Sequence, residues 1–259
     1  MAAISVIIVS HDKPKFVRQA IDSVLNQTFP DWEGWLVDSG VLLNQGFFDD
    51  IKDPRLKIMV SGEDRAQAQK TLMAGWCFNN WLNSGSPKGE LILYLCDDDF
   101  FYPRAFEIFW NYYIRYNRER QAMYASQDVG LGGRNGKTKI IAQRLADLPA
   151  GKFCNGRKLD RKVDYLQFCH TRKILDEFEK VYGTRRYHSE DKNDSNHADG
   201  IFMEQIGALT TIFPIPELVS CNRRTPQSTN CGTYQDTLWS KLMFRAKGKL
   251  VRTWQKYRA

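Results

Sequence analysis

Four short apolar segments in the first hundred residues constrain the fold most strongly, because stretches with helical periodicity separate them. The apolar segments lie at residues 4–9, 35–37, 56–60 and 91–95. Apolar side chains recur at three- and four-residue steps over residues 14–25 and roughly 65–82, and Pro103 opens a strongly aromatic helix. Strands that alternate with helices predict an α/β fold, with a mostly parallel central sheet flanked by helices.

The alternation becomes weaker beyond residue 120. We predict a strand at 122–126, a hairpin turn at Asn135-Gly136, a helix at 172–182 and a short helix at 199–206. The stretch 187–197 is polar and typical of a loop. No long linker, internal repeat or low-complexity segment divides the chain, so we expect one domain.

Polar side chains follow three of the predicted strands at the point where each strand ends. Ser10 and His11 follow the first strand, Asp38 the second, and the triplet Asp97-Asp98-Asp99 the fourth. The carboxyl ends of parallel strands meet at one edge of a sheet, and ligands of α/β proteins bind there. We therefore expect these side chains to converge on one rim.

Three adjacent aspartates are costly to place together, because like charges raise one another's pKa unless a cation or a donor compensates. Mg²⁺ or Mn²⁺ would compensate them, since both ions prefer oxygen ligands and take the remaining ligands from water or a diphosphate. The alternative is that Asp99 caps the helix near Pro103 while Asp97 and Asp98 are solvated. The nearby Asp38 favours the first interpretation, because such a rim suits a nucleotide.

The net charge of +7 comes from the C-terminal tail. Residues 241–259 hold seven basic residues and no acidic one, and the rest of the chain has as many basic as acidic residues. This neutral body argues against a nucleic-acid partner. The tail also carries apolar side chains, so we expect either a helix that contacts anionic lipid or a partner, or a solvated and frayed terminal helix.

Cysteine usage and apolar run lengths bear on the compartment. The six cysteines contain no C-x-x-C pair, and the longest apolar runs, Val6–Val9 and Leu91–Cys96, are far shorter than the roughly 18 residues of a membrane-spanning helix. These features predict a cytoplasmic protein, with peripheral contact at the inner face of the membrane through the tail.

Four segments together resemble family 2 glycosyltransferases with the GT-A fold, and within that family the spore-coat polysaccharide type. They are residues 5–13 (SVIIVSHDK), 20–29 (AIDSVLNQTF), 37–40 (VDSG) and 89–103 (GELILYLCDDDFFYP). The resemblance is dense over residues 4–105 and looser to about residue 230. It implies a nucleotide-sugar-binding half at 1–105 and an acceptor-binding half at 106–240, followed by the tail.

The same resemblance implies a metal-dependent, inverting transfer of a sugar from a nucleotide diphosphate to a hydroxyl of a glycan or polysaccharide precursor. Asp98 would be the direct ligand of Mn²⁺ or Mg²⁺, Asp99 would support it, and Asp199 would be the general base towards the acceptor. The implied nucleotide-binding residues are Val9, Ser10, His11, Asp38, Ser39 and Asp97.

Four positions depart from the family pattern and together leave the donor nucleotide open. One is Ala198, which replaces an acidic residue that often precedes the base. His11 stands where a tyrosine is common, Ser39 replaces the second aspartate of an acidic pair, and Cys96 replaces the first aspartate of the metal motif. A non-catalytic relative that binds glycans or nucleotides as a scaffold is the competing hypothesis. It predicts that substituting Asp199 leaves ligand binding and the biological role unchanged.

Four further residues each have two interpretations. His170 is either close to the acceptor site or a hydrogen-bonded core histidine. Lys13 either reaches the diphosphate or is a solvated charge, and the same two interpretations apply to Arg65 and Lys70.

Overall fold

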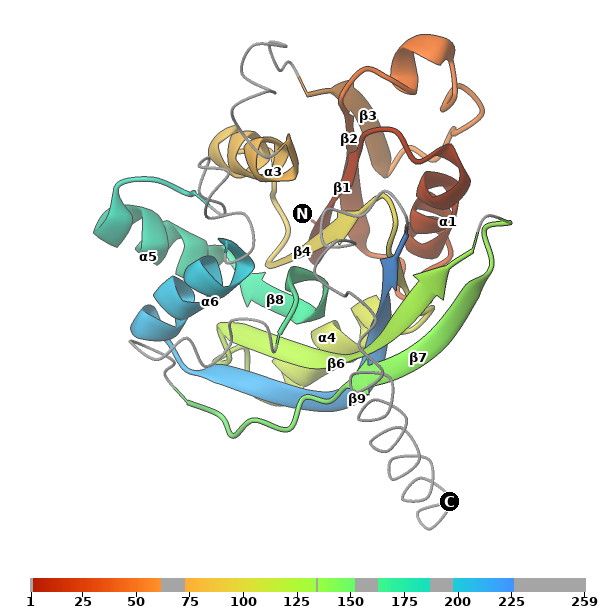
Figure 1. Ribbon diagram of the computed structural model, residues 1–259. Coiled ribbons are helices and arrows are strands. Elements are labelled where there is room, and N and C mark those ends of the chain that lie inside the picture. The colour runs from red at the N-terminus through yellow and green to blue at the C-terminus, as the bar shows by residue number, and fades with distance from the viewer. Residues whose placement is uncertain (1, 62–72, 134, 152–162, 187–197, 226–259) are drawn as a thin grey trace.

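The computed structural model describes residues 2–61, 73–133, 135–151, 163–186 and 198–225 (Figure 1). The strands of this part of the chain are β1 (Ile4–Ser10), β2 (Trp32–Asp38), β3 (Leu56–Val60), β4 (Leu91–Cys96), β5 (Phe100–Phe101), β6 (Ala122–Gly132), β7 (Thr138–Arg144), β8 (Phe168–Thr171) and β9 (Ile212–Arg224). The helices are α1 (Pro14–Leu25), α3 (Met73–Asn83), α4 (Ala105–Arg115), α5 (Arg172–Tyr182) and α6 (Ala198–Leu209), with short 3₁₀ turns η1 (Leu43–Gln45) and η2 (Tyr165–Gln167).

All nine strands belong to one sheet, whose main path runs β3-β2-β1-β4-β8-β6-β9-β5, with β7 paired to β6. The strands β3, β2, β1 and β4 are parallel neighbours, and β6 and β9 also run parallel. The β4–β8 and β6–β8 pairs are antiparallel. One sheet therefore crosses the boundary at residue 105, and the predicted α/β fold is confirmed.

Two apolar layers cover the sheet (Figure 1). The helices α1 and α4 pack on one face, where Ile4, Val6 and Ile8 of β1 point. The helices α3, α5 and α6 pack on the other face, against Ile7 and Val9. Alternate side chains of β1 thus enter opposite cores, which explains the uninterrupted apolar run Val6–Val9 in this strand.

The local patterns predicted several elements well. Helix α1 begins at Pro14 and buries the apolar face expected from its spacing. Helix α5 has the predicted bounds, because the Thr171 side chain accepts a hydrogen bond from the Ile174 N–H (3.1 Å) and Gly183 ends the helix with φ +73°. The predicted hairpin turn joins β6 to β7, with Gly136 at φ +78°.

The strands β5, β8 and β9 were not predicted. Pro214 and Pro216 interrupt the apolar pattern of β9. Proline is also atypical of a strand, because it cannot donate a hydrogen bond to the sheet. The register between β6 and β9 shifts on both sides of Ser126, next to this segment, so the two strands stay paired around the irregularity. Strand β6 is also longer than the predicted 122–126.

Parts of three predicted segments lie outside the described residues: the start of the 65–82 helix, the 187–197 loop and the C-terminal tail. Within the described ranges, no helix combines the length and the apolar character needed to cross a membrane.

Candidate active site

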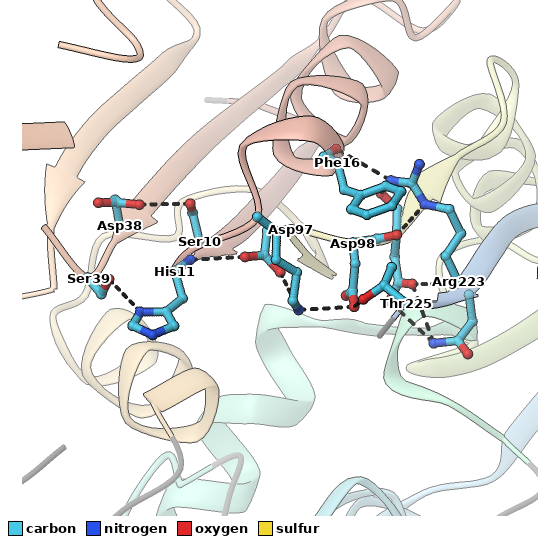
Figure 2. A network of polar contacts seen from close by, with 12 residues as sticks. Ser10, His11, Phe16, Asp38, Ser39, Asp97, Asp98, Arg223 and Thr225 are labelled. Carbon is cyan, nitrogen blue, oxygen red and sulfur yellow. Dashed lines mark hydrogen bonds and ion pairs between the residues drawn. The ribbon is translucent and has the colours of Figure 1, made fainter. Parts of the chain in front are cut away.

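The strand ends bring the predicted site residues together (Figure 2). In the sheet register Ser10 lies beside Asp38, and Val9 lies beside Cys96, the residue before the aspartate triplet. The Ser10 hydroxyl donates a hydrogen bond to Asp38 Oδ2 (2.7 Å), and the His11 backbone N–H donates to Asp97 Oδ2 (3.0 Å). The expected convergence on one rim is confirmed.

Asp38, one of the implied nucleotide-binding residues, is enclosed in the protein. Its side chain accepts from Ser10 through Oδ2, and from the backbone N–H groups of Gly40 (2.8 Å), Leu42 (3.2 Å) and Leu43 (3.1 Å) through Oδ1. The residue is fully buried. Its carboxylate therefore shapes the loop after β2, because these donors would otherwise lack partners.

The accessible part of the predicted nucleotide site is the pair His11 and Ser39. His11 is exposed, and its Nδ1 lies 2.8 Å from the Ser39 hydroxyl. Val9 and Ser10, in contrast, are buried beneath the rim. A ligand at this edge would meet the His11–Ser39 pair first, while Val9, Ser10 and Asp38 support it from below.

A buried ion pair occupies the centre of the rim. The Lys13 ammonium lies 2.9 Å from Asp97 Oδ1 and 3.0 Å from Asp98 Oδ2, and the three side chains are 17%, 5% and 9% exposed. Burial works to lower the pKa of Lys13, but the Asp97 and Asp98 carboxylates raise it above its ordinary value. Burial raises the pKa of Asp97, against the opposing effects of Lys13 and the His11 N–H. Lys13 is therefore not a solvated charge.

The oxygen atoms around Lys13 suit a divalent cation. Asp97 and Asp98 already hold one cation between them, and the Thr225 hydroxyl lies 3.5 Å from Asp98 Oδ2. Among the residues described, no group of three or more His, Cys, Asp or Glu side chains is arranged to hold a metal ion. A pair of carboxylates such as Asp97 and Asp98 fits Mg²⁺ or Mn²⁺, because these ions can take their remaining ligands from water and a diphosphate.

Asp99 differs from its neighbours, because it faces β9 and η2. Its carboxylate accepts from the Arg223 backbone N–H (2.7 Å) and the Tyr165 hydroxyl (3.1 Å), and its side chain is buried. Burial raises the pKa of Asp99 well above its ordinary value, and the Asp98 and Asp164 carboxylates add to this. These contacts give Asp99 a role in holding β9, and its expected support of a metal stays a prediction.

Arg223 is a site residue that the sequence analysis missed. It is 1% exposed, and its side chain donates to the backbone carbonyls of Asp98, Asp99 (3.3 Å) and Phe16 (3.4 Å) and to the Gln19 side chain. Its guanidinium carbon lies 4.8 Å from the centre of the Phe16 ring. The signal in the sequence was the switch from apolar to polar residues near the end of β9.

His170 lies in the core, so the second interpretation of this residue holds. Its Nδ1 lies 3.0 Å from the Thr171 carbonyl, and its Nε2 lies 2.7 Å from the Tyr94 hydroxyl. A carbonyl only accepts hydrogen bonds, so Nδ1 carries the proton and Nε2 accepts from Tyr94. Burial lowers the pKa of His170 to about 4 from the ordinary 6.5.

The lowered pKa of His170 predicts a loss of stability in mild acid. Below pH 6.5 His170 becomes protonated in the unfolded chain, whereas in the folded chain it stays neutral down to about pH 4. The free energy of unfolding should therefore fall by up to about 1.4 kcal/mol per pH unit across this window. Urea unfolding of the wild type and His170→Gln between pH 7 and pH 4.5 measures it. Parallel pH profiles for the two proteins would contradict the prediction.

Asp199 lies in the first turn of α6. Its side chain lies outside the described residues, as do Arg65 and Lys70, so the role of Asp199 as a general base stays a prediction.

Comparison with known proteins identifies the fold and a family that part of the chain resembles. Residues 5–75 match the model of Glycosyl transferase family 2. Protein CgeD of Bacillus subtilis (strain 168) is 27% identical over 231 residues, which cover 87% of this chain and 51% of CgeD. The chain thus spans about half the length of this relative.

Solved structures of S. aureus TarS share the fold. The complex of TarS 1–349 with UDP-GlcNAc has a TM-score of 0.57 and 14% identity, over 90% of this chain and 62% of TarS 1–349. The complex with UDP has a TM-score of 0.56 and 16% identity, over 87% and 61% of the two chains. The sequence match and the shared fold lead to one conclusion: the chain has the GT-A fold, and its residues 5–75 are similar to glycosyl transferase family 2.

Proposed function

We propose that this chain is a metal-dependent, inverting glycosyltransferase that moves a sugar from a nucleotide diphosphate to a hydroxyl of a glycan or polysaccharide precursor. The observation that carries the proposal is the cation-binding pair Asp97 and Asp98 at the end of β4, beside the exposed His11–Ser39 pair. A nucleotide sugar needs both features. Its nucleoside requires polar contacts, and its diphosphate requires the positive charge of a cation that the carboxylate pair would hold.

On the donor side, His11 and Ser39 would contact the nucleoside, and Asp97 would lie near the ribose. Asp98 would hold Mn²⁺ or Mg²⁺, with the Thr225 hydroxyl beside it. The bound ion would neutralise the negative charge that develops on the departing diphosphate. The family 2 match supports a nucleotide-sugar donor, and the TarS complexes make UDP and UDP-GlcNAc the first compounds to try.

On the acceptor side, Asp199 would take the proton from the acceptor hydroxyl. The hydroxyl oxygen would attack the anomeric carbon as the bond from this carbon to the diphosphate oxygen breaks, so the configuration inverts. The nucleotide diphosphate would leave with the electron pair of that bond. The resemblance of residues 198–202 to the family pattern supports this assignment.

Nucleotide binding tests the donor proposal. Thermal unfolding should be measured with UDP, GDP, dTDP and CDP, each with and without Mn²⁺. One nucleotide at about 100 times its Kd should raise Tm by about 5–10 °C, and only with Mn²⁺, because a ligand of the folded state stabilises it by mass action. Asp98→Asn should lose this shift, since it removes the charge that holds the ion.

The exposed Asp31→Asn serves as the control and should keep the shift. A failure of all four nucleotides to stabilise the wild type would refute the donor proposal. A shift of the same size without Mn²⁺ would refute the metal dependence alone.

One part of the proposal concerns the cellular setting. Residues 241–259 lie outside the described part of the chain, and their contact with anionic lipid at the inner face of the membrane stays a prediction. The seven basic residues of this segment and its apolar side chains support it.

A further inference from the structure

Lys13 occupies the position on the rim at which a divalent metal ion would bind Asp98. Its ammonium lies 3.0 Å from Asp98 Oδ2, the oxygen that also faces the Thr225 hydroxyl at 3.5 Å. It also lies 2.9 Å from Asp97 Oδ1. The ammonium therefore compensates the two carboxylates when no ligand is present.

A metal ion and the Lys13 ammonium cannot share Asp98 without cost. Two cations on one carboxylate oxygen repel each other, and the repulsion is strong where side chains are as little exposed as these. Lysine can resolve this conflict, because its ammonium is a point charge on a flexible stem. A diphosphate would offer the displaced ammonium new oxygen partners.

The rest of the rim keeps its shape if Lys13 leaves. The His11 backbone N–H donates to Asp97 Oδ2 (3.0 Å), on the oxygen that Lys13 does not use. The Arg223 side chain donates to the Asp98 backbone carbonyl and so holds the triplet from the other side. The Asp97 carboxylate and the Asp98 backbone thus stay in position through contacts that are independent of the ammonium.

We propose that Lys13 is an exchangeable counter-cation: it occupies Asp97 and Asp98 in the free protein and gives up Asp98 to a divalent ion when a nucleotide diphosphate draws the ammonium away. This proposal rests on the donor site described under the proposed function. It predicts that the free protein binds Mn²⁺ weakly and that Mn²⁺ and the nucleotide increase each other's affinity. Linkage makes this increase equal for the two ligands.

Mn²⁺ binding in the absence of nucleotide tests the proposal. The electron paramagnetic resonance signal of free Mn²⁺ reports the bound fraction for the wild type, Lys13→Met and Lys13→Arg. Lys13→Met should bind Mn²⁺ more tightly than the wild type by about 5–150-fold, the usual range of a coupling between two ligands. Lys13→Arg, which keeps the cation, should bind as weakly as the wild type. The exposed Lys52→Met is the control for the loss of one positive charge and should also match the wild type.

An unchanged or weaker Mn²⁺ affinity of folded Lys13→Met would overturn the proposal. If this variant does not fold alone, Mn²⁺ should restore its thermal transition, and failure to do so would count against the exchange. The proposed function can fail separately: tighter Mn²⁺ binding by Lys13→Met, together with no nucleotide binding by the wild type, would keep Lys13 as the counter-cation that competes with the metal ion and would remove the donor.

Discussion

Asp199→Asn is expected to slow sugar transfer by about 10²–10⁴-fold, which is the usual contribution of a positioned general base. Asparagine has nearly the same shape as aspartate but cannot take the acceptor proton. The metal-dependent thermal shift should stay at its wild-type value, because the base acts in the transition state and not in donor binding. The measurement is the release of nucleotide diphosphate from the donor that the thermal assay identifies, with a panel of sugar hydroxyls as acceptors.

A matched substitution on the neighbouring helix separates this effect from a general loss of charge. Asp176 of α5 pairs with Arg185 (2.7 Å) at the surface, and Asp176→Asn should leave transfer unchanged. Full transfer by Asp199→Asn would show that another group is the base. Nucleotide binding without transfer, in both the wild type and Asp199→Asn, would instead favour a non-catalytic glycan- or nucleotide-binding scaffold.

Arg223→Met should lower the free energy of unfolding by about 3–5 kcal/mol, the range for removing one member of a buried charged network. The Met side chain keeps an apolar contact beside Phe16, but the backbone carbonyls of Asp98, Asp99 and Phe16 each lose a donor. The aspartate triplet also loses a buried positive charge. Urea unfolding at pH 7.5 measures the change.

An exposed arginine directly before helix α4 provides the comparison. Arg104 pairs with Glu107 (3.1 Å), and its side chain is 67% exposed, so Arg104→Met should cost at most about 1 kcal/mol. Equal losses for Arg223→Met and Arg104→Met would show that the buried network contributes little. Because Arg223 holds the Asp98 carbonyl, Arg223→Met should also weaken the metal-dependent nucleotide shift.

Local side-chain patterns are enough to predict the parallel half of the sheet. The runs at β1 and β4 are apolar on both faces because helices cover both sides, and the spacing of α1 and α5 follows from one buried face each. Once these strands are parallel, their carboxyl ends must share an edge. The sequence pattern therefore predicts that Ser10, Asp38 and Asp97 lie on one rim.

The partners of those residues could not be predicted in the same way. Whether Asp38 faces a ligand or its own loop depends on how the chain turns at Gly40, and the sequence pattern does not specify that turn. Arg223 reaches Asp98 across a sequence separation of 125 residues, from a strand whose prolines interrupt its apolar pattern. No local pattern reports a contact of that sequence separation.

The sequence by itself thus determined the α/β fold, the position of the rim and the residue types on it, because the burial of apolar faces is encoded locally. Only the tertiary structure decided which of these polar groups stay accessible and which compensate one another. His11 and Ser39 remain open to a ligand, whereas Lys13 pairs with Asp97 and Asp98. The physical reason is that a buried charge takes whichever partner the packing brings within a few ångströms, and packing is a property of the whole chain.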